Sequence, residues 1–495
     1  MELFLSGPSY RYECENLCRL FFPYSPVKVE ELENGSVAIP TPKEGPWAAA
    51  CIDGKEGAYR YEVTVSDGEQ QLTRENTAPA LQEYAMTNLL YNAFVELTGV
   101  HPAWGMLTGI HPVKLLRQYV EERGEEEGVA YFQSHCHVTP PRADLAHRVL
   151  VAQTPAVEAL SENDFSLYVS IPFCPTRCAY CSFVSQDVEH AKKLIDPYFE
   201  LLLKELEKTA QVTRELGLSL VAVYIGGGTP TTLSAPQLFD LCGKIREVFD
   251  LSRCTEFTVE AGRPDTITQE KLMALRDQGI SRISINPQSL SDQVLKNIGR
   301  RHSAQDVIDA FALAQKLGFT NINADLIVGL PGDDLKSFRH TLDGVIGLGA
   351  SNVTVHSLAL KRSARLNAPG GDLSLHSQSK ETAAMMDYSI ERLTGEGFEP
   401  YYLYRQTRMA GNLENTGWAK PGTICRYNIY TMDESNSVIA CGAGGVSKLK
   451  DPYSGRLERI FNFKYPYEYI TRNGEILERK DGVTTLYEQF RQRLH

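Results

Sequence analysis

The sequence lacks the features that send a chain into a membrane or along a secretory route. It contains no run of about 18 apolar residues that could span a bilayer as a helix. Its first residues, Met1–Ser6, have neither the basic start nor the long apolar core of a signal peptide. We therefore expect a cytoplasmic protein whose eleven cysteines are free thiols or metal ligands rather than a disulfide framework.

An excess of basic charge is missing as well. The 495 residues carry a net charge of −12, whereas a general nucleic-acid binder needs a basic surface. We therefore expect no nucleic-acid partner, although this charge is compatible with a local basic pocket for an acidic small molecule. The apolar content of 42% is ordinary for a soluble globular chain, and the length allows several domains.

Three cysteines form the most informative motif. Cys174, Cys178 and Cys181 stand in a Cys-x3-Cys-x2-Cys pattern directly after the apolar run Leu167–Ile171, which is predicted to be a buried strand. Iron–sulfur clusters select thiolate ligands, and three thiolates leave one iron of a [4Fe–4S] cluster open to a small molecule. The alternatives are three unrelated cysteines in a turn, or part of a zinc site. Zinc sites usually pair Cys-x2-Cys with a second, distant pair, which the sequence lacks.

The sequence around these cysteines resembles that of a known family. With Tyr168 six residues before the first cysteine, it is similar to radical S-adenosylmethionine (SAM) enzymes. Together with Gly226–Pro230 and Gly329–Gly332, the segment Tyr-x-x-Ile-Pro-Phe-Cys resembles the oxygen-independent coproporphyrinogen III oxidase group, and within it the HemZ-type coproporphyrinogen dehydrogenases. The resemblance covers residues 1–450, and implies an oxidoreductase of heme and porphyrin biosynthesis with a [4Fe–4S] cluster and SAM as cofactors. It implies that Tyr168 contacts the cofactor.

The chain is predicted to contain three parts. Residues 1–150 form an α+β domain of unknown role, 160–375 the radical SAM core, and 376–495 a mixed α+β region that covers the substrate. In the core, apolar strands alternate with helical patterns, which is typical of a parallel sheet covered by helices. Six such units are too few for a closed eight-fold barrel, and the resemblance implies a partial (β/α)6 barrel. The expected strands are Leu167–Ile171, Leu220–Ile225, Glu256–Glu260, Arg282–Ile285, Ile322–Val328 and Asn352–Leu358.

The first region has its own local patterns. Alternation of apolar and polar residues predicts strands at Arg60–Val65 and Ser134–Val138. Spacing of apolar residues predicts a helix within Ala78–Leu97, and Glu125–Gly128 is interpreted as a solvated bend at the surface.

Two motifs are expected at the ends of the second and third core strands, where such barrels gather their chemistry. Glycine lets a backbone approach a ligand closely, and the resemblance implies that the loop of Gly227, Gly228 and Thr229 supports the amino group of SAM. Glu260 ends the third strand. Its carboxylate accepts hydrogen bonds only, and is expected to bind the ribose hydroxyls or the amino group of SAM.

Further cofactor residues are expected along the later strands. Arg300 can fork onto a carboxylate with two hydrogen bonds, and the resemblance implies that it binds the carboxylate of SAM, while Gln288 and Asp325 bind the ribose. Asp325 is a charged residue within an apolar strand, a costly placement that favours a functional role. His356 and Ala359 are expected to flank the adenine or a second SAM molecule. The alternative for each residue is a structural cap or ion pair.

The substrate site is expected in the C-terminal region. Coproporphyrinogen III, the tetrapyrrole that the resemblance implies, carries four propionates, which require cationic and amide donors. The segment 404–428 is dense in such groups, interleaved with aromatic residues; the alternative is an exposed loop with scattered charges. The candidates are Arg405, Arg408, Asn412, Lys420 and Arg426.

The preferred hypothesis is a SAM-dependent oxidative decarboxylation of coproporphyrinogen III to protoporphyrinogen IX, in which a 5′-deoxyadenosyl radical removes hydrogen from a propionate. An electron donor and an electron acceptor are required, and the sequence identifies neither. The sequence departs from the group at Phe183. The best-studied oxidases have a further cysteine at this position. This chain lacks that cysteine, as do heme-binding, chaperone-like relatives. The alternatives are therefore a heme-binding trafficking protein, which axial ligands near His356 or His376 would favour, and a radical SAM enzyme that opens or methylates heme.

Overall fold

The computed structural model describes residues 1–8, 10–23, 25–32, 45–181, 185–359, 379–406 and 410–492. The chain forms two compact units. The first comprises Met1–His147 together with Arg405–Leu413, and the second comprises Arg148–Tyr404 together with Glu414–His495. Among the described residues, no helix combines the length and apolar character that crossing a membrane requires.

The first unit is built on a five-stranded sheet with the order β2-β1-β3-β4-β5. Strand β1 pairs in parallel with β2 and β3, whereas β3, β4 and β5 pair antiparallel. Alternate residues of β1, β3 and β4 pack against α1 and α2 to form its main core. The elements are β1 Glu2–Ser6, α1 Arg11–Phe21, β2 Lys28–Leu32, β3 Trp47–Lys55, β4 Ala58–Ser66, β5 Gln71–Ala78, α2 Glu83–Thr98, α3 Pro112–Arg123, α4 Glu125–Cys136 and α5 Pro140–Glu158, the last of which continues into the second unit.

Two expectations for this unit were wrong. Ser134–Val138 is not a strand, because its first three residues end helix α4, in which Phe132 and Cys136 are buried one helical turn apart. Glu125–Gly128 is not a bend but the start of the same helix, where three acidic side chains suit the positive end of the helix dipole. The strand expected at Arg60–Val65 lies within β4.

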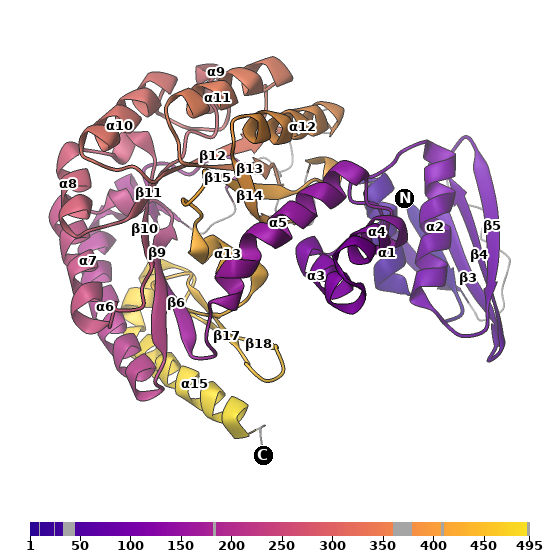
Figure 1. Ribbon diagram of the computed structural model, residues 1–495, viewed down its shortest axis with the longest axis horizontal. Coiled ribbons are helices and arrows are strands. Elements are labelled where there is room, and N and C mark those ends of the chain that lie inside the picture. Colours follow the sequence, from indigo (N-terminus) through magenta and orange to yellow (C-terminus); the bar gives the residue numbers. More distant parts are fainter. Residues whose placement is uncertain are drawn as a thin grey trace. The chain divides into compact units, whose positions relative to one another are not determined.

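The second unit contains the predicted partial (β/α)6 barrel. Its six core strands are parallel and follow the order β6-β9-β10-β11-β12-β13, and most of their residues are buried on both faces. Figure 1 shows that the helices between these strands follow the outer face of the curved sheet. The strands are β6 Asp164–Ile171, β9 Ser219–Gly227, β10 Glu256–Gly262, β11 Arg282–Ile285, β12 Ile322–Val328 and β13 Asn352–Ser357.

Local sequence explains where the outer helices begin. Each of six helices is preceded by a Ser, Thr or Asp whose side chain accepts a hydrogen bond from a backbone N–H of the first turn. Such caps satisfy donors that have no partner inside the helix. The helices and their caps are α6 Val188–Glu215 (Asp187), α7 Ala235–Val248 (Ser234), α8 Gln269–Asp277 (Thr268), α9 Asp292–Asn297 (Ser291), α10 Ala304–Lys316 (Ser303) and α11 Leu335–Gly347 (Asp334).

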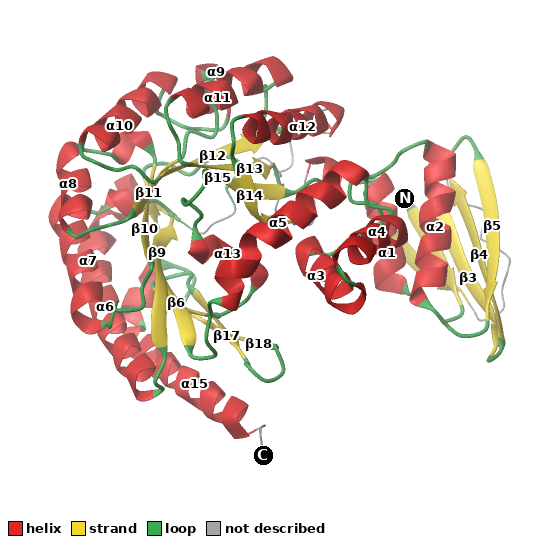
Figure 2. Ribbon diagram, viewed as in Figure 1, coloured by secondary structure: helices red, strands yellow, loops and turns green. Residues whose placement is uncertain are grey.

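The C-terminal residues extend the same sheet at both edges. Strand β16 pairs in parallel with β6 and is followed by β17 and β18, while β15 pairs antiparallel with β13 and carries β14. The result is one sheet of eleven strands in the part of the chain that the structure describes (Figure 2). The added elements are α12 Ser379–Gly395, β14 Glu399–Tyr404, β15 Asn415–Ala419, α13 Arg426–Asp433, β16 Ser437–Cys441, β17 Val446–Lys450, β18 Leu457–Phe461, α14 Pro466–Thr471 and α15 Asn473–Gln492.

Helix α13 lies against the inner face of the sheet (Figure 1). Its start is held by Glu256, the first residue of β10, which accepts hydrogen bonds from the Cys425 thiol at 2.9 Å and the Arg426 N–H at 3.0 Å. Because Glu256 stands at the amino end of its strand, the beginning of α13 is fixed at the amino edge of the sheet. From there, Tyr427 reaches the ring of Tyr224 in β9, with the ring centroids 4.5 Å apart.

A buried ion pair joins the C-terminal helices to the barrel. Glu205 of α6 accepts hydrogen bonds from the Gly442 N–H, the Asn462 amide and the Tyr469 hydroxyl, and its carboxylate lies 2.8 Å from Lys480 Nζ. The Glu205 and Lys480 side chains are almost completely buried. This cluster fixes the glycine-rich loop after β16 beside β6.

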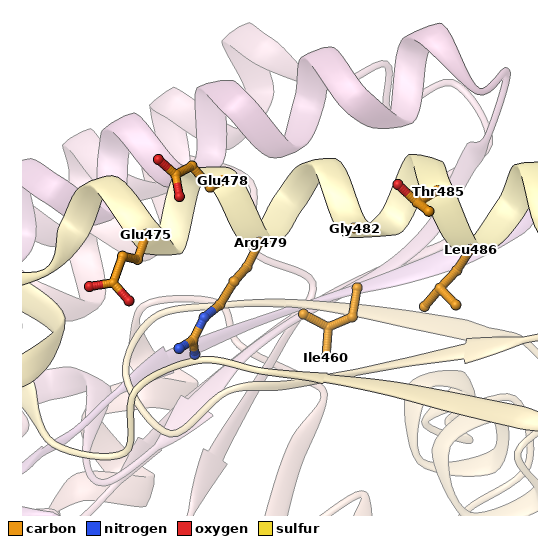
Figure 3. A pocket seen from close by; sticks show the side chains of 7 residues that line it. All are labelled: Ile460, Glu475, Glu478, Arg479, Gly482, Thr485 and Leu486. Atoms are coloured by element: carbon orange, nitrogen blue, oxygen red, sulfur yellow. The ribbon is translucent and has the colours of Figure 1, made fainter.

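A shallow hollow lies between α15 and the edge strand β18 (Figure 3). The Arg479 side chain crosses it and donates to the Phe461 carbonyl. None of the candidate site residues contributes to its lining, which is formed by Ile460, Glu475, Glu478, Arg479, Gly482, Thr485 and Leu486.

Candidate active site

The three cysteines lie on the loop that leaves β6 at the carboxyl edge of the sheet. Cys174 belongs to the short strand β7 (Phe173–Cys174), which pairs with β8 (Gln186–Asp187) where the chain returns. Cys178 is buried, while Cys174 and Cys181 are half-buried. Burial raises the pKa of the Cys174 thiol, so that its thiolate needs a compensating positive charge nearby.

The glycine loop packs directly on the cysteine loop. The Gly228 N–H donates to the Ile171 carbonyl at 2.8 Å, and the Thr229 N–H donates to the Phe173 carbonyl at 2.7 Å. A β-carbon at Gly228 would stand 2.5 Å from the Phe173 oxygen, a distance that real β-carbons essentially never show, and 3.0 Å from Cys174 Sγ, which is also tight. Gly227 has a φ of +105°, which L side chains rarely adopt. Glycine is therefore required at both positions to bring β9 against Cys174.

Glu260 lies near the end of β10 and faces an aromatic cluster. The Tyr224 hydroxyl donates to Glu260 Oε1 at 2.6 Å, and the ring of Tyr168 stacks 6.4 Å from that of Tyr224. Burial raises the pKa of Glu260 to about 7; the Tyr224 hydrogen bond opposes this rise and the nearby Asp325 reinforces it. A group that titrates near neutrality in such a place gains its full charge when a cation, such as a ligand amino group, comes beside it.

Gln288, Asp325 and His356 come from three neighbouring strand ends. The Gln288 N–H donates to the Asp325 carbonyl at 2.9 Å, which joins the residues after β11 to β12. His356 Nε2 lies 4.0 Å from Asp325 Oδ1, and the Asn323 amide donates to the same oxygen at 2.8 Å. Gln288 has a φ of +67°, a strained value for a residue with a side chain. Ala359 lies two residues beyond β13 and is half-buried.

Arg300 is close to the cysteine loop. Its guanidinium donates to the Asn286 carbonyl and to the Tyr180 hydroxyl, both at 3.0 Å. Its Nε, like the Oε1 of Gln288, is buried and has no hydrogen-bond partner among the residues that the structure describes. Buried polar atoms are nearly always satisfied, so these two atoms leave room for a further polar partner at the site.

The site as a whole fits the cofactors that the sequence implies. In the described residues, no three His, Cys, Asp or Glu side chains converge as one bound ion would require. A cubane cluster takes each thiolate at a separate corner, so the three cysteines need not meet at a point. Cys174, Cys178 and Cys181 would hold the cluster, and the glycine loop, Glu260 and Arg300 offer acceptors and donors for an amino acid beside it. The assignment of all these residues to the cluster or to SAM, and that of Tyr168, Gln288, Asp325, His356 and Ala359, stays a prediction.

Two of the expected substrate residues, Lys420 and Arg426, lie at the opposite, amino edge of the sheet. Lys420 follows β15, which runs antiparallel to β13, and its backbone N–H donates to the Ser351 carbonyl at the amino edge of the sheet. Arg426 begins α13 at the same amino edge. The remaining described candidates, Arg405 and Asn412, belong to the first unit.

Hydrogen bonds inside the first unit engage both of these residues. The buried Arg405 donates to the Leu107 and Asn412 carbonyls, and the Asn412 amide donates to the Leu20 carbonyl. Arg408, and the positions Phe183 and His376 discussed above, lie outside the described residues.

Sequence reasoning missed several residues that shape the site. Tyr224 and Tyr180 bond to the side chains of Glu260 and Arg300, respectively. Arg263 donates to Thr176, which lies between the first two cysteines. The available signal was the position of Tyr224, which is two residues before the glycine loop, and of Arg263, which is three residues after Glu260.

Known proteins match both the core and the wider chain. The radical SAM superfamily model matches residues 168–345. The oxygen-independent coproporphyrinogen-III oxidase-like protein HemZ of Bacillus subtilis is 37% identical over 379 residues, which cover 76% of this chain and 75% of that protein. The heme chaperone HemW of the same organism is 34% identical over 57% of this chain and 70% of its own length.

The solved structure of coproporphyrinogen III oxidase (HemN) from Escherichia coli, a radical SAM enzyme, has the same fold in its core. It superposes with a TM-score of 0.52 at 23% identity, covering 65% of this chain and 71% of that one. The radical SAM superfamily implies a [4Fe–4S] cluster and SAM as cofactors. By its sequence over three quarters of its length, the chain belongs to the radical SAM family of oxygen-independent coproporphyrinogen III oxidase-like proteins.

Proposed function

We propose that the protein decarboxylates coproporphyrinogen III oxidatively to protoporphyrinogen IX, using a [4Fe–4S] cluster and SAM. The observation that carries this choice of substrate is the similarity to the HemZ protein, which extends over 379 residues and thus well beyond the matched core 168–345. The packing of the glycine loop on Cys174, beside Glu260 and Arg300, supports a cluster that holds an amino acid.

Each residue of the site has a task in this proposal. When bound, the cluster supplies the electron that cleaves SAM and yields the 5′-deoxyadenosyl radical. Arg300 binds the SAM carboxylate, and Glu260 accepts from the amino group or the ribose, so that the reacting bond is held in one orientation. The Tyr168 and Tyr224 rings line the site and limit the access of water, which would quench a radical.

The chemistry balances for each propionate. The 5′-deoxyadenosyl radical removes one hydrogen atom from the carbon next to the ring, carbon dioxide leaves, and a vinyl group forms. One electron remains and passes to an acceptor that the proposal requires but does not identify. Two of the four propionates react in this way to give protoporphyrinogen IX.

A heme-binding trafficking role is the second candidate. It is favoured by the 34% identity to the heme chaperone HemW and by the position of Lys420 and Arg426, which lie at the amino edge of the sheet rather than near the cysteines. In that role the cluster site would be kept, whereas propionate decarboxylation would be absent.

An anaerobic assay separates the two. The protein is reconstituted with iron and sulfide, and supplied with SAM, a low-potential reductant, an electron acceptor and coproporphyrinogen III. We expect tricarboxylic and then dicarboxylic products by chromatography, with 5′-deoxyadenosine formed alongside. Unchanged coproporphyrinogen together with tight binding of heme would reject the decarboxylase and support the trafficking protein. The Cys178→Ala variant is the control for turnover that does not depend on the cluster.

A further inference from the structure

A buried arginine, Arg263, contacts the loop between the first two cysteines. Thr176 is two residues after Cys174 and two before Cys178. Arg263, which directly follows β10, uses one nitrogen, Nη1, to donate to the Thr176 carbonyl at 3.1 Å and to the Thr176 hydroxyl at 2.7 Å. Only 3% of Arg263 is exposed, whereas Thr176 is half-buried.

Asp265 fixes the orientation of this arginine. Its two carboxylate oxygens accept from Arg263 Nε at 3.0 Å and from Nη2 at 2.7 Å, a two-point contact that holds the plane of the guanidinium. An unpaired guanidinium would be costly at this depth, and Asp265 removes that cost. The short 3-10 turn Pro264–Thr266 places both residues on one side, which leaves Nη1 directed at the cysteine loop.

Thr176 also connects the loop to the segment after α9. Its hydroxyl donates to the Gly299 carbonyl at 3.3 Å while it accepts from Arg263. Further along the loop, the Ala179 N–H donates to the Ile298 carbonyl at 3.0 Å. Thr176 thus connects the cysteine loop to two neighbouring segments of the barrel, the one after β10 and the one after α9.

We propose that Arg263 is a positioning residue for the iron–sulfur cluster. Anchored by Asp265, it fixes the path of the chain between Cys174 and Cys178 and places a guanidinium beside the cluster these residues would hold. Arg263 donates no ligand atom: it acts on the loop through Thr176 and on the cluster through its positive charge. The inference rests on the proposed cluster, and its test is independent of the tetrapyrrole substrate.

The test uses the full-length protein, reconstituted under anaerobic conditions, in the variants Arg263→Gln, Arg263→Lys and Thr176→Val. Two quantities are measured: the rate at which an iron chelator removes the cluster, and the midpoint potential of the cluster by redox titration followed by electron paramagnetic resonance. The matched control is Arg282→Gln. Arg282 is also buried and donates to the carbonyls of Thr423 and Ile424, but at the amino edge of the sheet.

We expect Arg263→Gln and Thr176→Val to lose the cluster about 10 to 100-fold faster than the wild type, in line with the loss of metal affinity, roughly 10 to 100-fold, that follows removal of a residue that orients a metal ligand. In Arg263→Gln the potential falls as well, because a positive charge that favours the reduced cluster is gone while Asp265 remains. Arg263→Lys keeps the charge and the potential, but a compact ammonium cannot hold Asp265 and Thr176 together, so its rate of loss lies between those of the wild type and Arg263→Gln.

Two results would overturn the inference. One is an Arg263→Gln protein with the wild-type rate of cluster loss and the wild-type potential. The other is an Arg282→Gln control that loses its cluster equally fast, since the effect would then follow from the deletion of any buried arginine. Should Arg263→Gln fail to fold, Arg263→Lys and Thr176→Val decide the question by the rate of cluster loss: a wild-type rate in both would overturn the inference. A wild-type protein that takes up no cluster would instead overturn the proposed function, and this inference with it.

Discussion

The replacement of Glu260 by glutamine tests whether the ionised carboxylate lowers the stability of the fold while it strengthens the binding of SAM. The pKa of Glu260 rises from an ordinary 4.5 to about 7, chiefly because of burial. The folded protein therefore holds this proton more tightly than the unfolded chain, so stability is lost as the pH rises from 4.5 to 7. Each pKa unit is worth 1.36 kcal/mol, so the ionised carboxylate costs the fold about 3 kcal/mol above pH 8 and about 1 kcal/mol at pH 5.

Glutamine keeps the oxygen that accepts from Tyr224 and removes the charge. We expect Glu260→Gln without cofactors to unfold at a higher temperature than the wild type at pH 8.5, and to exceed it by only about a third as much at pH 5. The same substitution weakens the binding of SAM, because the amide cannot pair with the amino group. Thermal unfolding at both pH values and equilibrium dialysis of SAM into the reconstituted protein measure the two effects.

The control is Glu200→Gln, which changes an exposed glutamate of α6. It should alter neither the unfolding temperature nor the affinity for SAM. A Glu260→Gln protein that is less stable than the wild type at pH 8.5, or equally stable at both pH values, would refute the reasoning. The carboxylate would then be as well solvated in the fold as in water.

Three further predictions follow from single contacts. Arg300→Ala should keep the cluster and weaken SAM binding about 10 to 100-fold, the loss expected for a charge-assisted hydrogen bond of about 1.5–3 kcal/mol; full affinity in equilibrium dialysis would remove its assigned role. Gly228→Ala should reduce the iron content after reconstitution, because its β-carbon would meet the Phe173 oxygen at 2.5 Å, whereas Gly347→Ala, with nothing within 4 Å, should not. Lys480→Met should lower the free energy of unfolding, measured by urea titration, by about 3–5 kcal/mol, because the buried Glu205 carboxylate loses its cationic partner. Adding Glu205→Gln removes that unpaired charge and should recover much of the loss.

The core of the fold could be predicted because its signals are local. Each of the six parallel strands is a short apolar run bounded by turn residues, and the structure places each expected strand within a few residues of its observed bounds. The cysteine and glycine motifs were found for the same reason, since each stands directly after one of these strands. Their contact with one another follows from the pairing of β6 with β9.

The remainder depends on contacts between residues far apart in the chain. Strand β16 pairs with β6 across more than 250 positions, and nothing in the sequence of β16 specifies that partner. The direction of β15 carries Lys420 to the amino edge of the sheet, opposite the edge of the cysteines, and no local pattern signals that direction. Arg263 interacts with Thr176 although 87 positions separate them, a contact that no local pattern signals.

The measurement that tests the central claim most directly is electron paramagnetic resonance of the reduced, anaerobically reconstituted protein with and without SAM. We predict the signal of a single [4Fe–4S] cluster, whose spectrum changes when SAM is added because one iron accepts it as a ligand. Bound zinc in place of iron, or a cluster whose spectrum SAM leaves unchanged, would contradict the account.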